Sequence, residues 1–143
     1  MIKNYFIFFF LIILTTNVFA QEDYRTEKDL IGEKKISNDL YYGVQTARAV
    51  ENFQISLTKV ADYRDFIKAL GMVKLAAARA NHELGAIDDA VMDAVEKACK
   101  DVIEGKFDDQ FDIDMYQGGA GTSTNMAANE IIANVALEYM NKP

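Results

Sequence analysis

The sequence predicts a mainly α-helical chain that folds as one domain. Three segments carry apolar side chains at intervals of three and four residues, the repeat that places them on one face of a helix. These segments lie at about residues 62–83, 88–105 and 122–140. Only one Pro occurs in 143 residues, and no repeat or low-complexity linker divides the chain. This pattern indicates helices packed on helices around one core.

Residues 1–20 have the pattern of a secretory signal peptide. Lys3 precedes an apolar run from Tyr5 to Leu14, and the small residue Ala20 ends the segment. The run is about 10 residues long, whereas roughly 20 are needed to span a bilayer, so a retained membrane anchor is the less favoured alternative. We predict cleavage after Ala20 and export to the periplasm or the medium. Residues 21–143 would then be the mature domain.

Residues 21–40 are rich in charged side chains and are predicted to be an extended or mobile entry in which no packed core begins. A short helix is predicted after them, because apolar residues recur there at helical spacing. These residues are Val44, Ala47, Val50 and Phe53. Arg48 lies on the polar side of this helix, where a solvated side chain is one interpretation.

Two longer helices are expected to pack antiparallel, because the connection between them is short. Asp62 is predicted to cap the first helix, which runs to about Glu83 and stops at Gly85. The apolar stripe of the first helix is Phe66, Leu70, Val73, Ala77 and Ala80. Asp88 is predicted to cap the second helix and Gly105 to end it. The stripe of the second helix is Val91, Ala94 or Val95, Ala98 and Val102.

The chain has one Cys and one His, which exclude an internal disulfide and a zinc site with several Cys or His ligands. His82 is expected to be a charge partner near a helix C-terminus, with an acid–base role as the less favoured alternative. Cys99 is expected to be a small packed residue and not a nucleophile. The aspartates between residues 108 and 114 lack the Gly and terminal Glu of an EF-hand, so they predict a solvated acidic loop and not a calcium site.

The charge balance limits the partners of the protein. There are 22 acidic and 15 basic residues, and the formal net charge is −7. An acidic chain without a basic cluster does not bind nucleic acid or anionic membranes through its bulk charge. We therefore predict no nucleic-acid partner and, after signal cleavage, no stable membrane anchor.

The most informative stretch is a glycine turn, residues 118–121 (Gly-Gly-Ala-Gly). Its three glycines allow positive φ angles and a close approach of the backbone to another group. The next four residues favour helix N-caps, so the turn is predicted to begin a helix. They are Thr122, Ser123, Thr124 and Asn125, and the apolar stripe that follows is Met126, Ala133, Leu137 and Met140.

A helix N-terminus with bare N–H groups and neighbouring hydroxyls suits an anion such as a carboxylate or phosphate. The same spacing also starts many ordinary helices, so a ligand site and a plain structural turn both remain open. Nucleotide motifs do not fit. No Lys follows the glycines as in a P-loop, and no strand, turn and helix with a later acidic partner suggests a dinucleotide fold.

The residues around this turn resemble the first signature of the aspartase/fumarase superfamily. Matching residues are Gln117–Ser123, Asn125-Met126, Asn129-Glu130, Tyr41–Thr46, Arg48-Ala49, Glu51–Phe53, Lys74, Ala76–Ala78 and Asp109–Phe111. The resemblance covers about residues 27–140. Gly119–Ser123 favour the aspartate ammonia-lyase branch, because fumarases usually carry a Thr-Gly-Ser-Gly-Thr version of the turn.

The resemblance implies the N-terminal helical domain of an aspartase/fumarase-like lyase, without the central long-helix bundle through which the full-length protein forms a homotetramer. It implies reversible elimination of ammonia from L-aspartate to give fumarate, with no metal or organic cofactor. A fumarase, or an exported helical module that binds carboxylates without catalysis, is the alternative. Sequence past residue 143 would separate these three.

Family resemblance also assigns site residues. The Thr that matches Thr122 helps to hold the substrate carboxylate, with Ala120, Gly121 and Ser123 beside it, and the Arg that matches Arg48 lies near the active site. The catalytic Ser of the family lies far downstream of these motifs. No catalytic residue is therefore assigned to this chain, which is expected to be an N-terminal fragment that is inactive alone.

Overall fold

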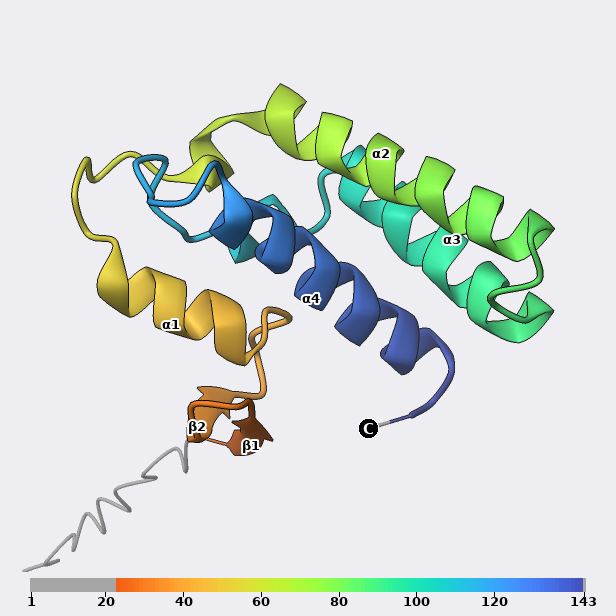
Figure 1. Cartoon of the computed structure of the whole chain (residues 1–143), viewed down its shortest axis with the longest axis horizontal. Helices are drawn as coiled ribbons and strands as arrows, with labels where there is room; N and C mark the ends of the chain where they lie inside the picture. Colours follow the sequence, from red (N-terminus) through yellow and green to blue (C-terminus); the bar gives the residue numbers. More distant parts are fainter. Residues whose placement is uncertain (1–22, 143) are drawn as a thin grey trace, which may run out of the picture.

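A computed structural model of the chain describes residues 23–142. The elements are β1 (Tyr24–Lys28), β2 (Glu33–Ser37), α1 (Val44–Asn52), η1 (Val60–Asp62), α2 (Arg64–Glu83), α3 (Asp89–Glu104), η2 (Asp108–Gln110) and α4 (Thr122–Tyr139). The prediction of a mainly α fold is confirmed. Helices α2 and α3 pack together, and α4 lies between this pair and α1 (Figure 1). The predicted signal peptide, with its cleavage site after Ala20, lies outside the described residues.

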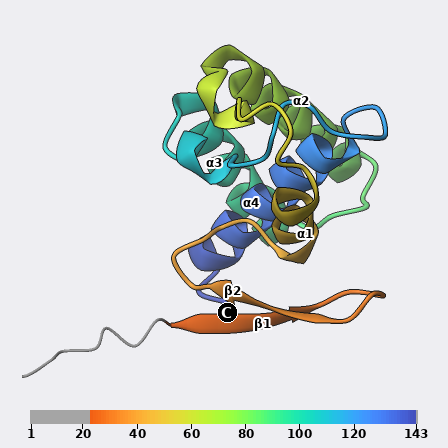
Figure 2. The same ribbon diagram turned by 90° about the vertical axis from the view of Figure 1, so that its left-hand side faces the viewer.

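The segment before α1 forms an antiparallel hairpin in which Tyr24 pairs with Ser37. The hairpin lies at one edge of the molecule, below α1 and α4 in the view of Figure 2. The predicted extended backbone is confirmed, but the expectation that no core begins here is wrong. Ile36 is 3% exposed and packs with Val44 and Ala47 of α1. Alternate residues of a strand face opposite sides, so one apolar residue among charged neighbours is enough to anchor it.

The first long helix begins one residue later than predicted. The Asp62 carboxylate accepts a hydrogen bond from the Lys59 amide at 2.9 Å and so closes η1, while Tyr63 occupies the N-cap of α2 without a side-chain bond. Asp62 is therefore not the cap of α2. The predicted end of α2 is confirmed, because the helix runs to Glu83 and Gly85 follows with φ +71°.

The apolar stripe predicted for α2 is also wrong, except for Leu70, which packs against the core. Phe66 is 42% and Val73 is 62% exposed, whereas the buried residues are Ile67 and Gly71. Gly71 explains the narrow contact, since a Cβ there would lie 2.9 Å from Cγ1 of Ile103. Because α2 approaches α3 closely at Gly71, the face of α2 that packs on α3 differs from the apolar face that the periodicity predicted.

Helix α3 matches its prediction at both ends. The Asp88 carboxylate accepts a hydrogen bond from the Val91 amide at 2.8 Å, and Gly105 ends the helix with φ +90°. Cys99 is fully buried, and this burial raises the pKa of its thiol to about 11, as expected for a packed residue. His82 lies 2.7 Å from the Asp89 carboxylate, which confirms the predicted charge partnership.

Replacing Asp88 by Ala is expected to destabilise the protein by about 1 kcal/mol, because the Val91 amide loses its capping acceptor. Urea denaturation followed by circular dichroism would measure this change. Asp93→Ala is the matched control, because Asp93 is an exposed residue in the interior of the same helix. Equal stability of the two variants would contradict the capping role.

Helix α4 carries the centre of the core. Its buried apolar residues are Ala127, Ala128, Ile131, Ile132, Val135 and Ala136. The stripe predicted from periodicity is wrong, since Ala133 is exposed and Met126 and Leu137 are only half-buried. A helix packed between α1 on one side and α2 and α3 on the other buries more than one face (Figure 1). Within residues 23–142, no helix is both long enough and apolar enough to cross a membrane.

Candidate carboxylate-binding site

The glycine turn enters α4 through three consecutive residues with left-handed backbone. Gly119, Ala120 and Gly121 have φ angles of +74°, +55° and +79°. Two of the three are glycines, which adopt this conformation without strain, whereas Ala120 pays the steric penalty of a Cβ. Gly121 is the N-cap and makes no side-chain cap bond. The predicted Ser, Thr or Asn cap is therefore wrong, because the helix already begins at Thr122.

A side chain from outside the helix satisfies one of its first N–H groups. The Gln117 Oε1 atom accepts a hydrogen bond from the Thr124 amide at 2.9 Å. Its Nε2 atom donates to the Thr124 hydroxyl at 2.8 Å and to the Asp114 carbonyl at 2.9 Å. Thr124 is only 5% exposed. The Gln117 side chain thus links the segment before the glycine turn to the buried Thr124 in the first turn of α4.

The glycine turn itself presents backbone N–H groups without acceptors. Within the part of the chain that the structure describes, the amides of Ala120, Gly121 and Ser123 have no hydrogen-bond acceptor. The Thr122 hydroxyl is exposed and donates to the Gly119 carbonyl at 2.6 Å, so it must rotate in order to donate to a ligand. The structure thus brings together the four predicted residues of the turn, with donors suited to an anion at the positive end of the α4 dipole.

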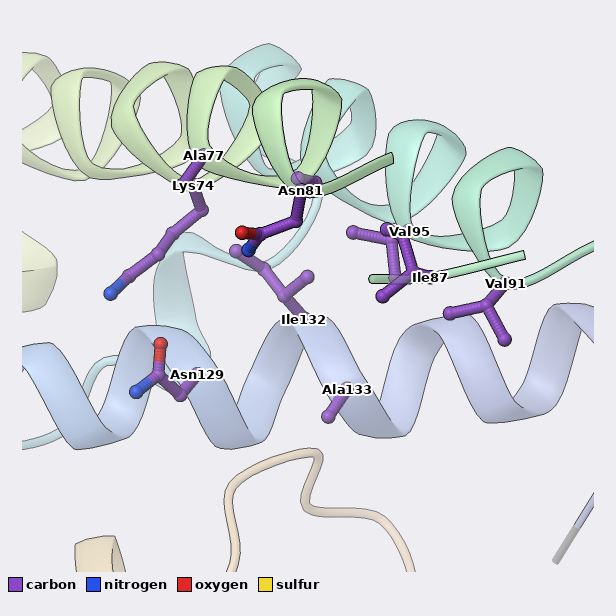
Figure 3. A pocket seen from close by; sticks show the side chains of 10 residues that line it. Lys74, Ala77, Asn81, Ile87, Val91, Val95, Asn129, Ile132 and Ala133 are labelled. Atoms are coloured by element: carbon purple, nitrogen blue, oxygen red, sulfur yellow. The ribbon is translucent and has the colours of Figure 1, made fainter. Parts of the chain in front are cut away.

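Lys74 adds a positive charge beside this helix end. Its ammonium donates to the side-chain oxygen of Asn125, in the first turn of α4. Figure 3 shows Lys74 and Asn129 near one end of a groove of about 290 Å³ between α2, α3 and α4. A cation and a helix N-terminus both favour bound anions. Sequence reasoning did not assign Lys74 to the site, although it is the one charged residue between Gly71 and Ala78.

Asp114 anchors the segment that leads into the turn. Its carboxylate accepts five hydrogen bonds, from the amides of Ile55 (2.9 Å), Ser56 (2.8 Å), Leu57 (3.1 Å) and Tyr116 (2.7 Å) and from the Ser56 hydroxyl (2.5 Å). These bonds, that of the Ser56 hydroxyl first, hold the pKa of Asp114 well below its usual range. Asp114 is 1% exposed.

The prediction of a solvated acidic loop is therefore wrong for Asp114. It is also wrong for Asp108, which is partly buried and lies 3.1 Å from Arg64. Both aspartates meet partners from distant parts of the sequence, which a local pattern cannot show. Among residues 23–142, no three His, Cys, Asp or Glu side chains are grouped as metal ligands.

The structure places Arg48 against the β1–β2 loop and not at the glycine turn. Its Nε and Nη2 atoms each donate to the Asp29 carboxylate at 2.9 Å, and Nη2 also donates to the Gly32 carbonyl at 3.2 Å. The Arg48 guanidinium lowers the pKa of Asp29 to about 2. The interpretation of Arg48 as a solvated side chain is thus wrong. A role in substrate binding stays a prediction, and it would require the guanidinium to leave Asp29.

The N-terminus of α1 is already filled by a carboxylate of the protein itself. Glu130 of α4 accepts hydrogen bonds from the amides of Gly43 (3.0 Å), Gln45 (2.9 Å) and Thr46 (3.0 Å) and from the Thr46 hydroxyl (2.6 Å). Gly43 is needed for this approach, because a Cβ there would lie 2.8 Å from the Glu130 carboxyl carbon. An internal anion satisfies α1, whereas the start of α4 is left open.

Comparison with known proteins gives one family. The family described as Lyase matches residues 32–143. Aspartate ammonia-lyase from Helicobacter pylori strain J99 is 55% identical over 116 residues, which are 81% of this chain and 25% of that protein. Fumarate hydratase class II from Halobacterium salinarum is 54% identical over 119 residues, 83% of this chain and 25% of that protein.

Solved structures agree with this result. Fumarate lyase:delta crystallin from Brucella melitensis, in the structure bound to cobalt, has a TM-score of 0.82 and 48% identity, covering 84% of this chain and 26% of that one. Class II fumarase from Schistosoma mansoni has a TM-score of 0.77 and 34% identity, covering 82% of this chain and 25% of that one. The chain therefore spans about a quarter of the length of the relatives that it matches.

Proposed function

This chain belongs to the lyase family, and on that premise we propose that it forms part of an aspartate ammonia-lyase, which releases ammonia from L-aspartate to give fumarate. The observation that carries the proposal is the open start of α4, where the turn presents unpaired amides and the Thr122 hydroxyl, and where Asn125 of the same first turn accepts a hydrogen bond from the Lys74 ammonium. The aspartate ammonia-lyase relatives and the Gly-Ala-Gly-Thr-Ser sequence of the turn support the choice of substrate.

Chemically, the elimination removes a proton from the carbon next to a carboxylate. Negative charge then builds on that carboxylate, so donors that are fixed beforehand hold it more strongly in the transition state than in the substrate. The amides of the glycine turn and the Thr122 hydroxyl bind and orient this carboxylate. No proton transfer is assigned to a residue of this chain.

Ammonia release from L-aspartate by the full-length protein that contains this chain tests the proposal. Hydration of fumarate, measured on the same preparation, tests the alternative that the protein is a fumarase, since a fumarate hydratase is 54% identical over the same region. Hydration without ammonia release would replace aspartate ammonia-lyase by fumarase. Fumarate binding with neither reaction would favour the exported carboxylate-binding module.

Replacing Thr122 by Ala should reduce kcat/KM for aspartate by about one to two powers of ten, the equivalent of losing one hydrogen bond to a charged group. Steady-state kinetics of the full-length enzyme would measure the loss, and Thr122→Ser, which retains a hydroxyl, should recover most of it. Thr26→Ala is a control, because Thr26 is exposed on β1. Near-normal kinetics of a folded Thr122→Ala enzyme would reject the assignment.

The family resemblance also supports proposals about the whole protein. We propose that it forms a homotetramer and that residues 1–20 direct its export, with cleavage after Ala20.

A further inference from the structure

We propose that Gln117 is the positioning residue of the carboxylate-binding site. Its side-chain amide determines where the N–H groups of the glycine turn and the Thr122 hydroxyl lie relative to α4. This inference rests on the proposed function, because it concerns the same site, and it adds a residue that does not itself touch the ligand.

The three hydrogen bonds of Gln117 use both ends of its amide group. The oxygen accepts from the Thr124 amide, while the nitrogen donates to the Thr124 hydroxyl and to the Asp114 carbonyl, all at 2.8–2.9 Å. Only a side chain with a donor and an acceptor on one planar group makes this set. Gln117 therefore connects the residue before the turn to a buried residue in the first turn of α4.

The turn has few other internal contacts to hold it. Two hydrogen bonds lie within it, both to the Gly119 carbonyl, from the Thr122 amide at 3.2 Å and the Thr122 hydroxyl at 2.6 Å. The second of these uses the hydroxyl that is proposed to bind substrate. When Thr122 turns toward a carboxylate, the Gln117 bonds remain and keep the left-handed backbone of Gly119, Ala120 and Gly121 in place.

Support for Gln117 from below comes from Asp114. The Asp114 carbonyl accepts from Gln117, while the Asp114 carboxylate is held by the amides of Ile55, Ser56 and Leu57. The hydrogen bonds of Asp114 thus fix the position of the turn relative to a loop that lies up to 59 residues earlier in the sequence. Rigid support of this kind lets donors act on developing charge without reorganising.

A double-mutant cycle in the full-length enzyme tests the inference. Gln117→Ala should lower kcat/KM for aspartate about tenfold. Combined with Thr122→Ala, the loss should be clearly smaller than the product of the two single losses, because both changes disable the same donors. Independent, multiplicative losses would show that Gln117 supports only the fold and would overturn the proposal.

The Gln117→Glu variant adds a pH readout that a purely structural role would not change. An ionised Glu has no donor for the Asp114 carbonyl, whereas a protonated Glu restores one. Activity relative to the unsubstituted enzyme should therefore recover as the pH falls toward about 5. The new carboxyl group faces the Asp114 carbonyl oxygen, which favours the protonated form and places the pKa near the upper end of the ordinary Glu range. A constant activity ratio across pH would contradict the proposal.

Amide NMR of the 143-residue chain, titrated with fumarate, separates this inference from the proposed reaction. The signals of Ala120, Gly121 and Ser123 should shift with fumarate in the unsubstituted chain and much less in Gln117→Ala. Thr26→Ala, a change of an exposed residue on β1 away from the turn, should leave those shifts intact. Equal shifts with and without Gln117, or none in either, would overturn the inference, whereas shifts without ammonia release would overturn only the proposed reaction.

Discussion

Replacing Asp114 by Ala is expected to lower the melting temperature of the protein by at least about 12 °C, the result of leaving several buried donors without an acceptor. Four amides and one hydroxyl converge on this carboxylate, which is 1% exposed. Its loss frees the 55–57 loop from the segment before the glycine turn. Differential scanning calorimetry would measure the change.

Two further variants define the cause of this effect. Asp114→Asn keeps one acceptor oxygen but turns an NH₂ group toward donors, so its melting temperature should lie between those of the unsubstituted protein and Asp114→Ala. Asp109→Ala is the matched control, because Asp109 is exposed in the same acidic segment. A similar loss in Asp109→Ala would show that general charge, and not the converging hydrogen bonds, controls stability.

The contribution of Asp114 should depend on pH with a definite sign. Because its pKa is lowered in the folded state, the carboxylate stabilises the fold at pH values above its ordinary pKa of about 4, and this stabilisation is lost as the pH falls below that value. Between pH 7 and pH 3, the melting temperature should therefore decrease more steeply for the unsubstituted protein than for Asp114→Ala. Parallel curves would contradict this assignment.

Replacing Glu130 by Ala should destabilise the protein by about 2–4 kcal/mol, because three amides at the N-terminus of α1 lose the carboxylate that accepts their hydrogen bonds. The amides of Gly43, Gln45 and Thr46 would then need water in a place where the two helices pack. Denaturant unfolding gives this value from the shift in midpoint at constant slope.

Glu130→Gln should have a smaller effect, since its amide oxygen still accepts from part of this set. Asn129→Ala, a change of the neighbouring exposed residue, serves as the control for effects of substitution on α4 itself. If Glu130→Ala and Asn129→Ala melt alike, water satisfies the start of α1 as well as Glu130 does, and the internal cap contributes nothing.

Several features of this protein followed from the sequence alone, and each of them is local. The ends of α3 were predictable because Asp88 caps an amide three residues away and Gly105 takes a left-handed conformation that suits glycine. The family was recognisable from residues that flank the glycine turn, and the match over residues 32–143 bears this out. Local hydrogen bonds and backbone preferences act within a few residues, so the sequence order contains the partners.

Tertiary structure decided the features whose partners are distant. The Glu130 carboxylate meets amides 84 to 87 residues earlier, and Asp114 meets amides 57 to 59 residues earlier. Neither contact leaves a mark on local spacing: the pattern predicted a solvated Asp114 and assigned no partner to Glu130. The apolar stripes of α2 and α4 failed for a related reason: periodicity gives one face of a helix, whereas the neighbours of α4 on two sides and the close contact at Gly71 determine which faces lose water.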